Sequence, residues 1–464
     1  MDVAQDLGAS MPAWLLYPVT LMVILMLIYP FYRARSVIGG FALFALCFRY
    51  IANAHHAITF KASPLGLSWN ALGSSAVFLV GLLLIKKRHL LLKQMMPVYC
   101  FIAVIVVSGM ANHDVHGIVD VVVKYGYLGL ITIVVYEGLD DLGENRMAVL
   151  LLWAFVMPFV LQALSVIFGV IKASESDGSV SYIGGYNHEA AFSIVLMTCF
   201  VIACFTTGIR PILRGAILCI CLVGILLANY RTAILALAPL AIIQFNMDVI
   251  GRFPRQQRSI VAVGVLLISL PAFLAVAWLL RDRFQDISVA LSSLDDLIKR
   301  PAEYSYEESR LLSGRPYIWS SYISAYMDGG TLNHLVGFGP DAWIGVFVAY
   351  AHNTLVSALY EYGIFGVCAL LYLWGAMLYT ALRVKHGPRG KLVAAHVSFF
   401  LLNMATMPQW MLEGDIRYGV ICGYTLYFYL RPVPTTVTAQ PMPTITPVPE
   451  MRTSRGMLAI DRKR

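Results

Sequence analysis

Long apolar runs separated by short polar loops occupy almost the whole chain. We place thirteen of them at about 11–32, 36–54, 67–85, 97–111, 117–137, 147–171, 188–208, 212–229, 232–247, 259–280, 353–381, 392–411 and 417–430. Most are close to the roughly 20 residues that an α-helix needs to cross about 30 Å of hydrocarbon. The pattern therefore predicts an all-α polytopic membrane protein with about 12–13 transmembrane helices.

Composition supports this interpretation. The chain is 59% hydrophobic and 13% charged, with a mean hydropathy of +0.72, whereas a water-soluble domain carries about 25% charged residues. The formal net charge is +8, but the cations are scattered over short loops, so we expect no nucleic-acid partner. The eight cysteines all fall in apolar runs, and we predict neither a disulfide framework nor a metal site.

The distribution of Lys and Arg predicts the orientation. One set of alternate loops, including the C-terminal tail, holds 22 of them, and the other set holds 10. Because cation-rich loops stay in the cytoplasm, we expect the N-terminus outside and the C-terminus inside. Residues 1–430 then form the transmembrane domain. Residues 431–464, rich in proline and basic at the end, form a tail that we expect to be disordered and cytoplasmic.

One long loop, residues 281–351 between spans ten and eleven, is predicted on the outer side. Residues 287–300 have helical apolar spacing, and residues 313–316 contain a helix start signal. Three aromatic residues share one face of the helix that follows: Trp319, Tyr322 and Tyr326. We interpret this stripe as a helix lying at headgroup depth, where aromatic rings are favoured; direct stacking on a glycan is the alternative.

Three residues at the outer ends of helices carry candidate chemistry. Arg231 and Arg315 each begin a predicted helix, where a cation opposes the helix dipole by roughly 0.3–1 kcal/mol. An anionic ligand would offset that cost. The alternative for Arg231 is that its side chain snorkels to water or pairs with a carboxylate of the protein. The alternative for Arg315 is that it is an ordinary solvated loop residue. His352 precedes a helix that Asn353 or Thr354 can cap. This position favours a neutral imidazole able to accept a proton, although a hydrogen-bonded interfacial histidine would look the same.

Three further charged residues, Arg49, Lys124 and Glu361, lie within predicted spans. Charged residues at membrane depth are typical of transporters, so a small-anion transporter is the rival class of function. We see no internal repeat, and we expect these three residues to form salt pairs with one another.

The order of several short motifs resembles that of the O-antigen ligase/polymerase superfamily of membrane glycosyltransferases. The resemblance covers about 229–366 and rests on residues 229–233, 313–315 with Trp319, 337–339, 352–354 and 361–366. It implies a GT-C-like fold with a periplasmic loop over the site, in the bacterial inner membrane. Thirteen spans is one more than the usual twelve.

The resemblance also implies substrates and residue roles. The donor would be a glycan on undecaprenyl diphosphate, held by Arg231 and Arg315, and His352 would deprotonate the acceptor hydroxyl. No cofactor or metal is implied. We keep His188, Glu189 and Asn353 as second-rank site residues. Glu189 suits a helix N-terminus electrostatically, so a structural cap is our preferred interpretation of it.

The acceptor is left open by the sequence. A polymerase would attach the glycan to another repeat unit of O-antigen or exopolysaccharide, and a ligase to lipid A-core. We slightly favour a polymerase, because the amphipathic loop and the polar segment around 186–189 could grip a long glycan. A protein acceptor is less favoured because the tail is too short to form a soluble domain. Membrane lipid and other polysaccharide-assembly proteins are the remaining expected partners.

Overall fold

The computed structural model describes residues 10–431 except 65, 174–179, 249, 255, 265–266, 268–298, 307, 310–313 and 386. Contacts divide the chain into Met1–Leu430 and Arg431–Arg464, and the helical fold belongs to the first of these units. The predicted helix at 287–300, Ser313 of the predicted start signal, most of the predicted span 259–280 and the tail beyond Arg431 lie outside the described residues.

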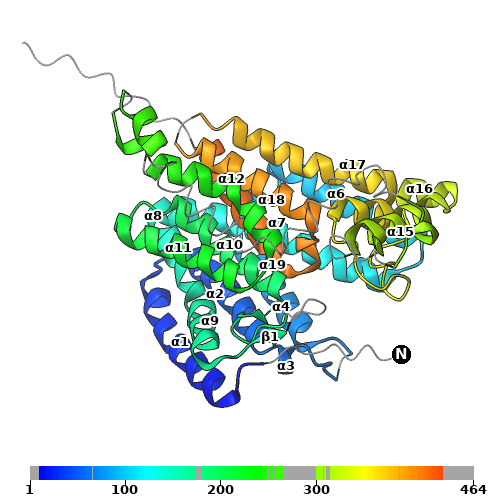
Figure 1. The fold of residues 1–464 in the computed structure, drawn as a ribbon, viewed down its shortest axis with the longest axis horizontal. Coiled ribbons are helices and arrows are strands. Elements are labelled where there is room, and N and C mark those ends of the chain that lie inside the picture. Colours follow the sequence, from blue (N-terminus) through cyan, green and yellow to red (C-terminus); the bar gives the residue numbers. More distant parts are fainter. Residues whose placement is uncertain are drawn as a thin grey trace, which may run out of the picture. The chain divides into compact units, whose positions relative to one another are not determined.

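The described part of the chain is almost wholly helical (Figure 1). Its longer helices are α1 (Ala13–Arg33), α2 (Val37–Ala54), α4 (Trp69–Leu84), α6 (Met96–Ala111), α7 (Val115–Leu142), α8 (Glu144–Leu152), α9 (Val156–Phe168), α10 (Glu189–Phe205), α11 (Pro211–Leu227), α12 (Arg231–Asp248), α15 (Arg315–Met327), α17 (Thr354–Leu382), α18 (Arg389–Ala405) and α19 (Leu412–Leu430). Three shorter helices are α3 (His56–Thr59), α5 (Lys87–Leu90) and α16 (Thr331–Val336). A small antiparallel pair joins β1 (Lys172–Ala173) to β2 (Val180–Ser181).

The architecture is that of an all-α polytopic membrane protein. Within the described residues, six segments are long and apolar enough to cross a membrane by length and composition: Ala13–Arg33, Val37–Ala54, Lys93–Ala111, Val115–Leu142, Glu144–Phe168 and Thr354–Leu382. The helices α4, α10 and α11 are apolar but shorter. The count of 12–13 transmembrane helices stays a prediction.

The predicted boundary between the last two spans is wrong. We expected spans at 392–411 and 417–430, but α18 ends at Ala405 and α19 already begins at Leu412. A 3-10 turn at Pro408–Trp410 separates them, because proline lacks the N–H that a continuing α-helix needs. The N-terminal end of α19 therefore contains polar residues that the sequence pattern assigns to a loop.

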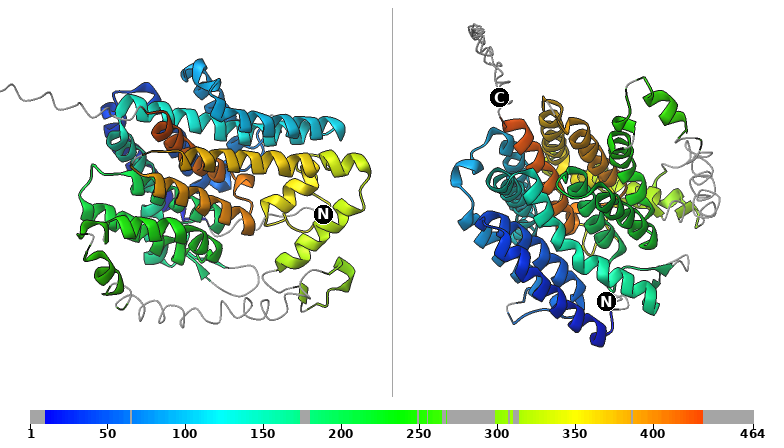
Figure 2. Two further views of the ribbon diagram at one scale, coloured as in Figure 1. Left: turned by 90° about the horizontal axis from the view of Figure 1, so that it is seen from above. Right: turned by 90° about the vertical axis from the view of Figure 1, so that its left-hand side faces the viewer.

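The centre of the fold is formed by α7 and α19, which pack along each other. Gly419 and Gly423 of α19 face α7, where an added Cβ would lie only 2.8 Å from Ile131 and 2.7 Å from Val135. Small residues at such positions let two backbones approach closely, as is common between membrane helices. Around this pair, α12 packs on α18 and α17 runs beside α6 (Figure 2).

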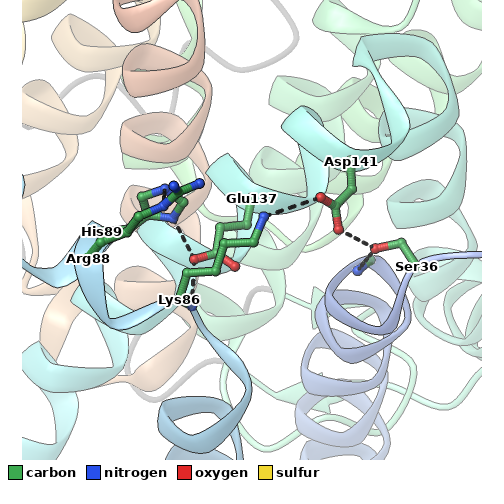
Figure 3. A network of polar contacts seen from close by, with 7 residues as sticks. Ser36, Lys86, Arg88, His89, Glu137 and Asp141 are labelled. Atoms are coloured by element: carbon green, nitrogen blue, oxygen red, sulfur yellow. Dashed lines mark hydrogen bonds and ion pairs between the residues drawn. The ribbon is translucent and has the colours of Figure 1, made fainter.

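Loops rich in Lys and Arg gather at the end of the helices where α7 terminates. In Figure 3, Glu137 of α7 accepts a hydrogen bond from the Lys86 backbone N–H at 2.9 Å and contacts the His89 ring at 2.6 Å. One turn further on, Asp141 accepts from Ser36 at 3.0 Å and lies 3.6 Å from the Lys86 ammonium. The loop at Ser36 and the loop at 86–89, which the charge count assigned to one side of the membrane, are thus both in contact with the end of α7.

Candidate active site

The two candidate arginines begin helices that meet at the opposite end of the fold. Arg231 is the first residue of α12 and Arg315 the first residue of α15. The Arg315 guanidinium donates a hydrogen bond to the Thr232 hydroxyl at 3.2 Å, which brings it to within one residue of Arg231 along the chain. Both arginines are half-buried. The N-termini of α12 and α15 therefore meet, and the Arg315 guanidinium lies at the first turn of α12, an arrangement suited to an anion.

His352 lies immediately before α17, two residues after Tyr350. Its backbone is left-handed, with φ of 51°, a conformation that His, Asn and Asp adopt more readily than most residues. The imidazole packs against Tyr350, with ring centroids 4.0 Å apart. Burial, with smaller contributions from Arg315 and His188, lowers the pKa of His352 to about 4. The ring is therefore neutral near pH 7 and able to accept a proton.

Asn353 holds His352 in place. Its side-chain oxygen accepts from the backbone N–H groups of Leu355 at 2.9 Å and Val356 at 3.3 Å, which confirms the predicted cap of α17. Its amide group donates to the Met404 carbonyl at 3.1 Å. Because both ends of the side chain are engaged, Asn353 positions His352 by joining the start of α17 to the end of α18.

His188 and Glu189 stand at the start of α10. The His188 ring nitrogen Nδ1 accepts from the Ala190 N–H at 3.1 Å and so caps the helix. The Glu189 carboxylate forms an ion pair with Lys172 at 3.2 Å. Although His188 and Glu189 have these structural contacts, their charges reach the candidate site. His188 adds to the effect of burial that lowers the pKa of His352, and Glu189 adds to the effect of desolvation that raises the pKa of half-buried Tyr350.

A break in α17 receives the glycine-rich turn at 337–339. The N–H groups of Phe338 and Gly339 each donate at 3.0 Å to the carbonyls of Tyr360 and Glu361. At Gly363 the helix is interrupted, with φ 63° and ψ −162°. A Cβ at Gly337 would lie 2.2 Å from the Glu361 carbonyl carbon, so only glycine fits this approach. The partner of this turn is the backbone of α17.

The middle of the aromatic stripe of α15 packs inside the protein. Tyr322 is 1% exposed and stacks on Phe347 with centroids 3.9 Å apart, because residues 337–351 fold back over α15. Trp319 and Tyr326 are half-buried, and the Trp319 indole donates to the Ala351 carbonyl at 2.7 Å. Tyr322 therefore has neither of the predicted settings, and with Trp319 it anchors the segment that ends at His352.

Charged residues within the spans have carboxylate partners that the sequence did not reveal. Arg49 forms an ion pair with Glu413 of α19 at 2.5 Å, and Lys124 with Asp120 at 2.5 Å. The expected pairing of Arg49, Lys124 and Glu361 with one another is therefore wrong. Acidic residues at the start of an apolar helix are a known N-terminal signal, and Glu413 with Asp415 could have been recognised in this way.

Glu361 and Arg417 also differ from expectation. The Glu361 carboxylate accepts from the Ser357 hydroxyl, from Tyr362 at 3.0 Å and from the Asp341 backbone N–H at 3.0 Å. Arg417, which we counted among outer-loop cations, is fully buried within α19 and donates to the Ser398 hydroxyl at 2.7 Å. Arg417 joins α19 to α18, whereas Glu361 joins α17 to the loop at Asp341.

Comparison with known protein families gives a match to the middle part of the chain. The family model described as O-Antigen ligase matches residues 216–371, about a third of the chain. This segment belongs to the O-antigen ligase/polymerase superfamily. A search of curated proteins finds no match to the chain.

The O-antigen ligase segment contains α12, α15, α16 and the first part of α17. Arg231, Arg315 and His352 all fall inside it, whereas His188 and Glu189 fall outside. The chain is therefore an integral inner-membrane protein with a function of the O-antigen ligase/polymerase type, which acts in general on a lipid-linked glycan donor and an acceptor.

Proposed function

We propose that the protein transfers a glycan from undecaprenyl diphosphate to an acceptor hydroxyl at the periplasmic face of the bacterial inner membrane. The observation that carries the proposal is the hydrogen bond of Arg315 to Thr232, the residue after Arg231. The effect of the Arg315 charge on the pKa of His352 supports a site that combines the two arginines with a neutral base. The comparison with O-antigen ligases supports the same class of reaction.

The proposed reaction is a substitution at the anomeric carbon of the donor. His352 takes the proton of the acceptor hydroxyl while that oxygen forms the new glycosidic bond. The bond between the anomeric carbon and the diphosphate oxygen breaks, and its electron pair leaves with undecaprenyl diphosphate. Arg231 and Arg315 stabilise the charge that develops on the leaving diphosphate, which is most effective where donors are already oriented and water is scarce.

The orientation of the site follows from charge. The helix ends that carry Arg231, Arg315 and His352 are opposite the end where cation-rich loops meet around Glu137. Because cation-rich loops remain in the cytoplasm, the site faces the periplasm and Arg431 the cytoplasm in our proposal.

For the acceptor we favour a repeat unit, which makes the protein a polymerase of O-antigen or exopolysaccharide. Tyr322 of the α15 stripe gives this choice no support, because its ring is buried against Phe347. Support remains from the polar segment 186–189, where Asn187 and His188 border a cavity of about 390 Å³. Ligation of the glycan to lipid A-core is the alternative within the same chemistry.

A gel of surface polysaccharide from a deletion strain tests the proposal. Loss of a polymerase leaves products with a single repeat, and loss of a ligase leaves core without glycan. An unchanged polysaccharide ladder would contradict both.

Complementation with His352→Asn then tests the base. Asparagine tolerates the left-handed backbone, so the change removes the imidazole without adding strain. His113→Asn is the matched control, because His113 has φ of 58° and is exposed at the same end of α7 as the site. We expect His113→Asn to restore the polysaccharide and His352→Asn not to. Restoration by both variants would remove His352 from the mechanism.

A further inference from the structure

A cavity of about 390 Å³ lies between α2, α4, α7 and the first turns of α10 and α19. All of its lining residues are outside the segment that matches O-antigen ligases. The volume is within the range of about 300–1,000 Å³ that is usual for small-molecule sites. Its polar lining comes mainly from Arg49, Asn70, Ser75, Asp120, Lys124 and Glu413.

The charges in the cavity wall compensate each other. The Arg49 guanidinium makes two contacts with the Glu413 carboxylate, at 2.5 and 3.1 Å, and Lys124 lies 2.5 Å from Asp120. The formal charge of these four residues is zero. An anion would find each cation already neutralised, and a lipid chain would leave polar groups of the wall, such as the Ser74 hydroxyl, without a hydrogen-bond partner. A neutral ligand with many hydroxyl groups suits this lining best.

Hydrogen-bonding groups in the wall are held in fixed positions. Arg49 donates to the Asn70 side-chain oxygen at 2.6 Å, and Asn53 donates to Glu413 at 3.0 Å. The Ser74 hydroxyl, also in the wall, is buried and has no hydrogen-bond partner among the described residues. Oriented amides and hydroxyls of this kind fix a polar ligand and provide specificity.

The cavity adjoins the reaction centre through the start of α10. His188 is part of its lining, and two other lining residues, Ala191 and Met411, pack in one apolar cluster with Tyr230, the residue before Arg231. A ligand in the cavity is therefore close to the start of α12, where we propose that the diphosphate binds.

We propose that this cavity is a glycan subsite, which binds an uncharged sugar unit of one of the two substrates next to the bond that forms. This inference rests on the proposed function and names the substrate class of a part of the site that the family match does not cover. The sugar unit belongs either to the acceptor chain or to the donor glycan, and both present the same hydroxyl groups.

The test fills the cavity from α4. Ser75→Leu places an apolar side chain into the cavity, whereas Ala76→Leu adds the same side chain at the next residue, which is exposed and outside the lining. Asn70→Ala removes a hydrogen-bonding amide. With the purified full-length protein in lipid vesicles, we expect Ser75→Leu and Asn70→Ala to raise KM by about tenfold or more, with kcat nearly unchanged. Ala76→Leu should behave as wild type.

The substrate whose KM rises identifies the source of the sugar. A rise for the acceptor assigns the cavity to the acceptor chain, and a rise for the donor assigns it to the lipid-linked glycan. Unchanged KM values for both substrates in Ser75→Leu would overturn the inference.

A binding measurement separates this inference from the proposed function. The probe is an oligosaccharide repeat released from the surface polysaccharide of the same strain and added to the protein without any lipid-linked donor. We expect binding to wild type and Ala76→Leu, and at least tenfold weaker binding to Ser75→Leu. Equal binding by the two leucine variants, or none by wild type, would refute the subsite even if transfer is observed. Selective binding would uphold it even if transfer fails.

Discussion

The acid limit of activity is the most direct consequence of the environment of His352. The base must be neutral to accept a proton, so activity is lost as the pH falls through its pKa. Because this pKa is lowered to about 4 by burial, Arg315 and His188, the loss should come well below the pH expected for an ordinary histidine. At pH 5.5 about 97% of the rings would be neutral, against about 9% for a histidine with a pKa of 6.5.

The assay is the initial rate of transfer by the purified protein in vesicles, between pH 4 and 8. We expect the rate to change little from pH 7.5 to 5.5 and to fall by half near pH 4. Circular dichroism at each pH checks that the fold is retained. A half-maximal rate between pH 6 and 7 would refute the reasoning, because it would require an imidazole that neither burial nor Arg315 affects.

A second arm uses His188→Asn. Asparagine is also a favoured N-cap, so α10 keeps its cap while the ionisable imidazole that contributes to the low pKa of His352 is removed. The pKa of His352 should then rise, and the acid limb should move to higher pH. His113→Asn should leave the profile unchanged, and a shift of equal size in both variants would contradict the assigned cause.

Three further predictions concern the arginine site, the buried ion pair and the helix break. Arg315→Lys should lower kcat/KM roughly 10- to 100-fold, because a point charge replaces a bidentate donor. Arg300→Lys is the control, because Arg300 is exposed in the same loop. Equal kcat/KM values for the two variants would argue against a diphosphate at Arg315. Glu413→Gln should destabilise the protein by about 3–5 kcal/mol by leaving Arg49 buried without its partner. Thermal unfolding in detergent measures this, and a double change of Arg49 and Glu413 to Met that is as destabilised as Glu413→Gln would contradict the explanation. Gly337→Ala should abolish accumulation of folded protein. Gly345→Ala should be tolerated, because Gly345 also has a positive φ but nothing lies within 4 Å of its added Cβ. Similar yields of the two variants would show that the close approach of Gly337 to α17 is unimportant.

Local signals in the sequence predicted much of the fold and the positions of the site residues. Pro316 after Arg315 predicted the start of α15, and Asn353 predicted the start of α17, because caps and first-turn residues act on their own neighbours. Apolar length predicted nearly every described helix. These features depend on contacts within a few residues, which a single sequence contains.

Contacts between distant segments could not be predicted in the same way. Arg49 and Glu413 are 364 positions apart, and nothing near either residue indicates the other. The spacing of Tyr322 indicated only an apolar helix face. Whether that face meets lipid, glycan or Phe347 depends on how residues 337–351 return over α15. Hydrophobic periodicity indicates which face of a helix is apolar, but the partner against which that face packs depends on the tertiary fold.

The left-handed backbone at residue 352 restricts which amino acids this position can hold. β-Branched and bulky side chains are disfavoured at positive φ, and the residues that tolerate it best are Gly, Asn, Asp and His. Of these four, only His exchanges a proton with an ordinary pKa between 5 and 8. Two requirements therefore restrict residue 352: its backbone conformation and its proton exchange. Substitution of residue 352 by every other amino acid would separate them, because more variants should fold than should be active.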